Sequence, residues 1–195
     1  MFGRYANVES DSPFKPKYYP KEDARVNTFV GYASWAKQGF EEKILTASDF
    51  FSSDRSYTYS VYYKGEIFMF ALQYYFGQQK LDALMRKYFS VWNGHHVSTE
   101  DMKRFFEKET NTELDWLFEE WLNTTKRCDY AVTGSGGHWN HESRLYEAEI
   151  NFKRCGQIEM PLDVTIRLNN DSALSYRIPA REDDPIERTV CLDAE

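Results

Sequence analysis

The strongest hydrophobic pattern in the chain lies at residues 57–77. Between residues 67 and 76 only Gln73 is clearly polar. An apolar run of ten residues is too short to span a bilayer and is typical of a helix buried in a protein core. Gly77 suits the position just after such a helix, where a residue in the left-handed conformation ends it without a Cβ clash.

One side of this predicted helix is more polar than the rest. At 100° per residue, Tyr62, Glu66, Met69 and Gln73 fall within a narrow sector. A buried helix with such a stripe either borders a cleft or hides a cluster of satisfied polar groups. The pattern alone leaves both interpretations open.

Further helices are predicted on either side of this segment. Short helices are expected at residues 29–40 and 47–53, the latter with Ser48 as N-cap, and a turn at 54–56. An amphipathic helix follows at 78–91 and ends at Asn93-Gly94, which places His95 and His96 in a turn. A capping box of Ser98 and Asp101 opens the next helix, and a last one begins at 112–115 and repeats apolar residues to 122. Three prolines between residues 13 and 20 exclude a helix there, so residues 1–28 are predicted to be a long loop.

The apolar period drops from 3.6 toward 2 after residue 123. Strands are predicted at residues 130–132, 145–152, 162–168, 173–178 and 189–192, separated by turns at 134–137, 156 and 169–171. The sequence therefore predicts an α+β chain in two parts, a mainly helical part at 1–125 and a small antiparallel β-domain, a sandwich or curled sheet, at 126–195. The seam is expected between residues 123 and 130.

Charge and composition narrow the choice of partners. The formal net charge of −7 and the pI of about 5.2 argue against nucleic acid or an anionic membrane surface. No apolar h-region of a signal peptide and no membrane span are expected, and the compartment stays unassigned. Cys128, Cys155 and Cys191 lie far apart and form no C-x-x-C motif, although one pair could form a disulfide.

Four elements resemble a known family in their order and spacing. They are the sequence Y-Y-K-G at 62–65 with its apolar helix, the helix at 81–92, the V-S-T-E-D-M start at 97–102, and L-D-W-L-F-E-E-W-L at 114–122. Together they resemble the zinc aminopeptidases related to aminopeptidase N, the gluzincins. The resemblance covers residues 57–123 and extends more loosely to the strand at 160–168. It implies the α-helical half of a thermolysin-like peptidase domain followed by a small β-sandwich-like domain.

The resemblance assigns a catalytic role to Tyr62. In the gluzincins, the tyrosine of Tyr-x-Lys-Gly donates a hydrogen bond to the negatively charged oxygen that forms during peptide hydrolysis. The competing interpretation is a core tyrosine among the 14 of the chain. Tyr57, five residues upstream, matches a position where a substrate-binding tyrosine sometimes lies in the family, although packing is the alternative.

The zinc site of the family is missing from the sequence. It requires H-E-x-x-H and a third ligand, whereas all four histidines of this chain follow Tyr62 and none belongs to such a motif. The chain thus looks like the stretch downstream of the zinc ligands, and we expect it to bind no metal, zinc being the cofactor of the intact enzyme. His138 and His141 are predicted to lie in a polar surface loop. The adjacent pairs Glu41-Glu42 and Glu119-Glu120 are not expected to form acid/base dyads.

Two functional hypotheses follow. The first is the C-terminal portion of a zinc aminopeptidase, which supplies Tyr62 but is inactive alone; its partners would be the N-terminal zinc-bearing half and the peptide substrate. The second is a non-enzymatic scaffold or peptide-binding module that reuses the fold. If a covering half is absent, an exposed apolar face would favour self-association.

Overall fold

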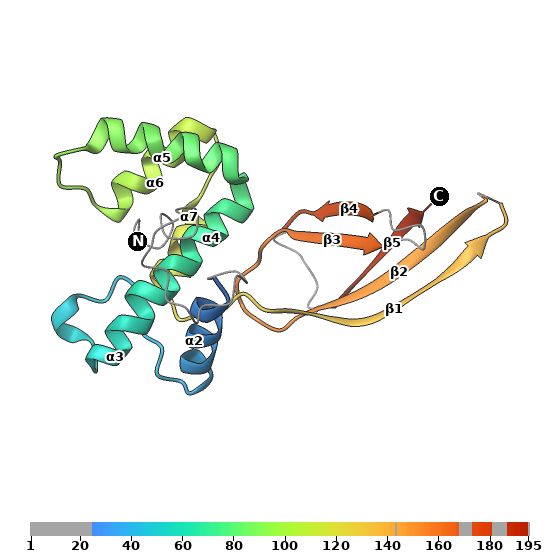
Figure 1. The fold of residues 1–195 in the computed structure, drawn as a ribbon, viewed down its shortest axis with the longest axis horizontal. Coiled ribbons are helices and arrows are strands. Elements are labelled where there is room, and N and C mark those ends of the chain that lie inside the picture. Colours follow the sequence, from blue (N-terminus) through green and yellow to red (C-terminus); the bar gives the residue numbers. More distant parts are fainter. Residues whose placement is uncertain (1–24, 143, 168–172, 181–186, 195) are drawn as a thin grey trace, which may run out of the picture. The chain divides into compact units, whose positions relative to one another are not determined.

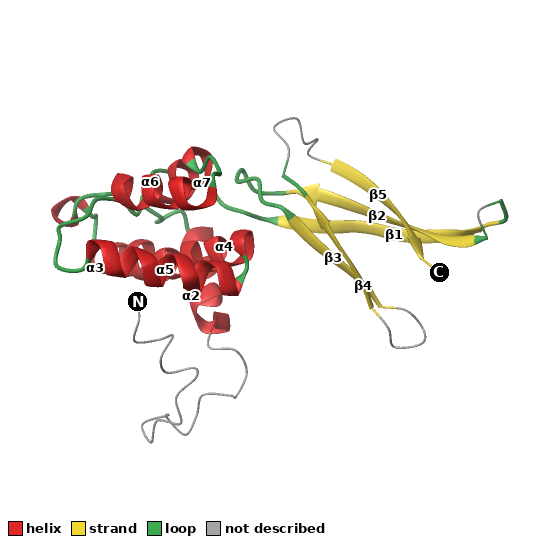
Figure 2. Cartoon of the chain, turned by 90° about the horizontal axis from the view of Figure 1, so that it is seen from above, coloured by secondary structure: helices red, strands yellow, loops and turns green. Residues whose placement is uncertain are grey.

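A computed structural model describes residues 25–142, 144–167, 173–180 and 187–194 of the chain (Figure 1). It divides into two compact units, Met1–Thr125 and Lys126–Glu195. The described part of the first unit is helical and that of the second is built of strands (Figure 2), so the chain is α+β. The predicted loop at residues 1–24 lies outside the described residues.

The helical unit holds eight described helical segments. They are α2 (Arg25–Lys37), the single 3₁₀ turn η1 (Ser48–Phe50), α3 (Asp54–Tyr57), the π-helical η2 (Thr58–Tyr63), α4 (Lys64–Phe76), α5 (Gln78–Trp92), α6 (Thr99–Thr110) and α7 (Asp115–Leu122).

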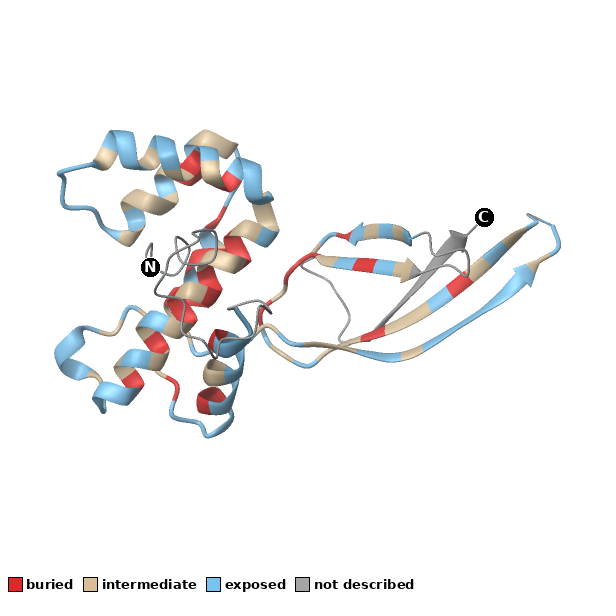
Figure 3. Cartoon of the chain, viewed as in Figure 1, coloured by how far each residue is buried: buried red, intermediate tan, exposed pale blue. Residues whose placement is uncertain are grey.

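Helix α4 is the core of this unit, as its apolar sequence predicts. It carries the largest group of buried residues in Figure 3 and contacts α2, α5 and α7. Phe68 of α4 packs edge-on against Phe118 of α7, with ring centroids 5.2 Å apart. Gly77 ends the helix with φ of 81° and ψ of 150°, so the positive φ is confirmed, although ψ lies outside the left-handed helical region.

The segment before α4 differs from the prediction. Helix α2 begins at Arg25, inside the predicted loop, and passes through Gly31 without a break. A Cβ at Gly31 would lie only 2.8 Å from the Tyr63 ring, so this glycine permits close packing and does not interrupt the helix. The predicted turn at 54–56 is wrong because Ser53 caps a helix there, its hydroxyl accepting the Ser56 N–H at 3.1 Å. Ser48 is not an N-cap: Ala47 precedes η1 without a side-chain hydrogen bond.

The two helices after α5 begin in different ways. At α6 the predicted capping box is confirmed, since Asp101 N–H donates to Ser98 Oγ at 3.2 Å and Ser98 N–H donates to Asp101 Oδ2 at 2.9 Å. Helix α7 begins at Asp115 after Leu114, which has no capping side chain of its own. Glu107 of α6 instead accepts the Leu114 N–H at 2.9 Å.

The second unit contains two antiparallel sheets in its described residues. Their strands are β1 (Tyr130–Asn140), β2 (Leu145–Arg154), β3 (Leu162–Arg167), β4 (Ala173–Ile178) and β5 (Glu187–Ala194). Strands β1, β2 and β5 pair in that order, and β3 pairs with β4. Phe152, Val164 and Ile178 form a buried cluster drawn from β2, β3 and β4.

The predicted turn at residues 134–137 is wrong. This Gly-Ser-Gly-Gly segment is part of β1, and it continues the pairing with β2 after a register shift between Val132 and Gly134. The turn at Gly156 is confirmed by its contacts, because its N–H donates to Asp129 O at 2.9 Å. A Cβ on Gly156 would lie 2.2 Å from Arg127 O, so only glycine fits this approach of two backbones.

Candidate functional site

Tyr62 lies on η2 with 57% of its surface exposed. The interpretation of Tyr62 as a packed core residue is therefore wrong. Its ring meets that of Tyr57 edge-on, with centroids 5.6 Å apart and an interplanar angle of 83°. Tyr57 in turn packs edge-on against Phe51, with centroids 5.2 Å apart. The structure thus brings together the two tyrosines singled out from the sequence.

The π-helical turn explains how residues five apart meet. In an α-helix, Tyr57 and Tyr62 would point about 140° apart. Here Lys64 N–H donates to Tyr59 O, five residues back, and the wider turn moves both tyrosines toward one side. A hydrogen bond with Tyr62 and the nearby Tyr62 phenol raise the pKa of Tyr57 above its ordinary value. The sequence contains no signal for this extra residue in the helix.

The other tyrosines of η2 face α2. Tyr59 stacks on Trp35 with ring centroids 5.1 Å apart, and Tyr63 lies against Tyr59 at 4.7 Å. Gly31 gives the Tyr63 ring the room that it needs. The aromatic side chains of this segment therefore lie on two sides: Tyr59 and Tyr63 pack toward α2, and Tyr57 and Tyr62 lie on another side.

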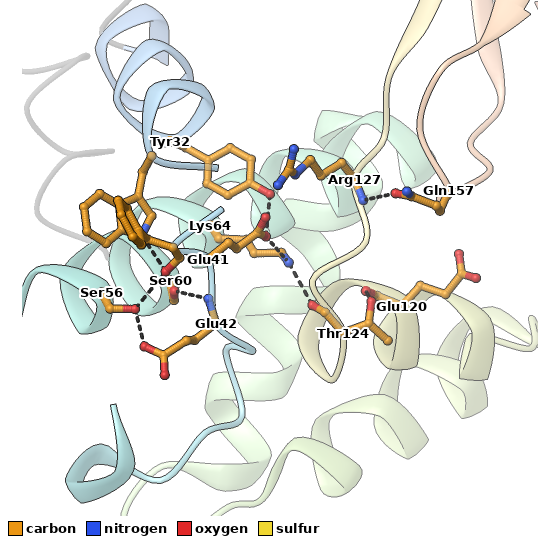
Figure 4. A network of polar contacts seen from close by, with 12 residues as sticks. Tyr32, Glu41, Glu42, Ser56, Ser60, Lys64, Glu120, Thr124, Arg127 and Gln157 are labelled. Atoms are coloured by element: carbon orange, nitrogen blue, oxygen red, sulfur yellow. Dashed lines mark hydrogen bonds and ion pairs between the residues drawn. The ribbon is translucent and has the colours of Figure 1, made fainter. Parts of the chain in front are cut away.

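Lys64, two residues after Tyr62, is fully buried, and its side chain is held by an ion pair and a hydrogen bond (Figure 4). Its Nζ lies 2.6 Å from Glu41 Oε1 and donates to Thr124 O at 2.9 Å. Tyr32 OH donates to the same Glu41 oxygen at 2.7 Å. A buried charge is tolerated only when it is paired and hydrogen-bonded, and this lysine meets both conditions. The group is called the Lys64 anchor below: Lys64, Glu41, Tyr32 and the Thr124 carbonyl.

Sequence reasoning missed Glu41 as a partner of this site. It lies 23 positions before Lys64, and no period or motif links the two residues. Glu41 and its neighbour Glu42 have different partners. Glu42 accepts hydrogen bonds from Ser52 and Ser56, and these bonds, that from Ser56 above all, hold the pKa of its carboxyl below the usual value.

Two residues of the polar stripe have hydrogen-bond partners, since Gln73 Nε2 donates to Gln78 Oε1 and Glu66 binds a residue of α2. Glu66 Oε2 accepts a hydrogen bond from the buried Thr28 hydroxyl of α2 at 2.9 Å. Glu66, Met69 and Gln73 are all half-buried, whereas Tyr62 is exposed. The four residues therefore do not share one environment, because the π turn departs from 100° per residue.

The histidines do not gather into a metal site. No group of three His, Cys, Asp or Glu in the described part of the chain could hold a metal ion. His138 lies on β1, where its Nε2 is 3.4 Å from Glu147 Oε2, so its assignment to a loop is wrong; His141 does lie in the β1–β2 turn. His95 follows the turn at Gly94, as expected. The described residues of this chain thus do not fit the zinc site of a gluzincin.

None of the described helices is long and apolar enough to cross a membrane. Two cysteines, Cys128 and Cys155, are free thiols. Burial, with a smaller effect of Asp129, raises the pKa of Cys128 to about 11.

No curated protein sequence matches the chain significantly. The sequence model of the "Peptidase family M1 domain" matches residues 23–121, just over half of the chain, and the match includes the tyrosine pair and all three side chains of the Lys64 anchor. The chain belongs to peptidase family M1.

Proposed function

We propose that this chain is the portion of an M1 zinc aminopeptidase that follows the zinc ligands, and that Tyr62 stabilises the oxyanion of the tetrahedral intermediate there. The complete enzyme would remove N-terminal residues from peptides. Tyr57 would contact the substrate beside it. Alone, the chain would be inactive, because its own residues hold neither the zinc ligands nor the general base.

The observation that carries this proposal is the exposure of Tyr62 on a helix whose next residues are buried. A side chain that must meet a substrate has to reach solvent, yet its backbone must be held in place. Tyr62 is 57% exposed, whereas Lys64 and Gly65, two and three residues after it, are buried. Its ring also meets that of Tyr57 edge-on, with centroids 5.6 Å apart.

The chemistry of a phenol suits this role. A neutral hydroxyl donates a hydrogen bond more strongly to a charged oxygen than to a ground-state carbonyl. Such a donor, held before the reaction begins, lowers the barrier because no reorganisation is needed as the charge forms. Tyr62 would thus act on the intermediate and contribute little to substrate binding.

Exposed apolar side chains of the helical unit are consistent with a covering partner. Val26, Phe29 and Val30 of α2 and Phe89 of α5 are each at least 44% exposed. We propose that the zinc-bearing half of the enzyme covers part of this surface. Without it, self-association would be the alternative.

The proposal is tested by restoring the missing half. A hybrid in which the zinc-bearing half of an M1 aminopeptidase precedes this chain should hydrolyse aminoacyl anilides, and a chelator should abolish the activity. A hybrid that folds, holds one zinc and hydrolyses no aminoacyl substrate would contradict the enzyme assignment and favour the scaffold or peptide-binding module.

A further inference from the structure

The Lys64 anchor joins three segments that are distant in sequence. Glu41 precedes Lys64 by 23 residues, and Thr124 follows it by 60. Tyr32 of α2 binds the same carboxylate, so one lysine ties α2, the segment after it and the end of α7 to the first turn of α4. Figure 4 shows these groups converging on Lys64.

The position of this anchor relative to η2 is the basis of the inference. The N–H of Lys64 closes the π-helical turn by donating to Tyr59 O, while its side chain is held by the anchor. One residue thus fixes both the end of the turn and its attachment to the core. Tyr62 lies within the turn that Lys64 closes.

A π turn needs such support. Its hydrogen bonds are less favourable than those of an α-helix, and it occurs as an isolated turn that its surroundings must maintain. If η2 reverted to α-helical hydrogen bonding, Tyr57 and Tyr62 would turn about 140° apart and lose their contact. The register of the turn therefore decides where the Tyr62 hydroxyl lies.

We propose that Lys64, through its buried pair with Glu41, is a positioning residue that holds η2 in the π register and thereby presents the Tyr62 hydroxyl beside Tyr57. For catalysis this rests on the proposed function, but the positioning itself is a property of the chain alone. Glu41 acts through Lys64 and touches neither tyrosine ring in the contacts described above. The Lys64–Glu41 pair thus positions the side chains of the site and does not contact the reacting atoms.

The test uses the full chain labelled with ¹³C-tyrosine and measures the ring-to-ring nuclear Overhauser effect between Tyr57 and Tyr62 by NMR. The principal variant is Lys64→Met/Glu41→Gln, which removes both buried charges and keeps an acceptor for Tyr32. We expect the variant to fold, the effect between the two rings to be lost, and the pKa of Tyr57 to fall toward its ordinary value. Lys103→Met, which removes an ion-paired lysine of α6, is the matched control and should change neither signal.

Two outcomes would overturn the proposal. If the double variant folds and keeps the ring contact and the raised Tyr57 pKa, the anchor does not position the tyrosines. If the double variant does not fold, the anchor stabilises the whole helical unit, and a specific role in holding the π turn of η2 is ruled out. The single variant Lys64→Arg keeps the positive charge, so it should retain part of the contact between the Tyr57 and Tyr62 rings that the double variant loses.

A readout in the hybrid enzyme separates this inference from the proposed function. Lys64→Met/Glu41→Gln should lower kcat by roughly 10–10²-fold with little change in KM, as expected for a misplaced catalytic group. Adding Tyr62→Phe should then cause little further loss, because the hydroxyl is already displaced. If Tyr62→Phe alone changes nothing, the proposed function fails, while the NMR result still decides the positioning role.

Discussion

Lys64 Nζ and Glu41 Oε1 lie 2.6 Å apart in a place from which solvent is excluded, and their side chains are 0% and 2% exposed. The lysine of the Y-Y-K-G sequence thus lies in the interior of the helical unit, whereas the tyrosine two residues before it lies on the surface. The two residues are close in sequence, yet their side chains have opposite environments. This division follows from helical geometry, because residues two positions apart point to nearly opposite sides of a helix.

Breaking this ion pair from one side should strongly destabilise the chain. Lys64→Met leaves the Glu41 carboxylate buried without its cation, which costs about 3–5 kcal/mol in the free energy of unfolding. Lys64→Met/Glu41→Gln removes both charges and should recover most of this loss. Urea denaturation measures both values; equal stability of Lys64→Met and wild type would contradict the buried position of the pair.

A single methyl group at Gly156 should destabilise the β unit. Gly156→Ala brings a Cβ within 2.2 Å of Arg127 O, and relief requires the backbone to move. We expect a loss of at least about 1–3 kcal/mol, the range for overpacked sites. Gly136→Ala is the matched control, because nothing lies within 4 Å of its Cβ position. Thermal denaturation, followed by circular dichroism at the wavelengths that report β-sheet, compares the two variants. If Gly156→Ala is as stable as Gly136→Ala, the two backbones do not approach each other as described.

The stabilising effect of Glu42 should depend on pH. Its hydrogen bonds with Ser56 and Ser52 lower its folded-state pKa below the ordinary 4.5. The contribution of the Glu42 carboxylate to the free energy of unfolding is therefore present above pH 4.5 and is lost as the pH falls through the lower folded-state pKa. The stability difference between wild type and Glu42→Gln should be largest near neutral pH and shrink below about pH 4.5. Urea denaturation across this range is the measurement, with the exposed Glu113→Gln as the control. A difference that does not vary with pH would exclude the carboxylate as its source.

The free thiols should differ in reactivity. Cys155 is exposed, whereas burial raises the pKa of Cys128 to about 11 and keeps it protonated at pH 8. Iodoacetamide at pH 8 should therefore label Cys155 well before Cys128, as peptide mapping by mass spectrometry can show. Comparable rates at the two thiols would mean that Cys128 is accessible.

The sequence was most informative where a local rule decides the structure. The apolar residues of α4, the period of α5 and the capping box at Ser98 depend only on neighbours within a few positions, and all three predictions are confirmed. The Gly-Ser-Gly-Gly segment has the composition of a turn, but pairing with β2, which is a non-local interaction, keeps it extended.

The candidate site was predictable only in part. Tyr62 and Tyr57 were named from a motif and its spacing, but the π turn that brings their rings together leaves no mark on hydrophobic periodicity. The partner of Lys64 was missed for a related reason. Glu41 is one of 31 acidic residues, and only the folded chain shows which of them is buried beside the lysine.

The central claim is tested most directly by Tyr62→Phe in the hybrid enzyme that carries a zinc-bearing half. The change removes one hydroxyl and almost no volume, so kcat for an aminoacyl anilide should fall by roughly 10²–10³-fold, the effect of losing one oxyanion donor, while KM changes little. Tyr63→Phe, whose ring packs against Tyr59 and the Gly31 position, should keep near-full turnover. If Tyr62→Phe also retains the full kcat, Tyr62 is not the oxyanion donor and the proposed function is wrong at its central residue.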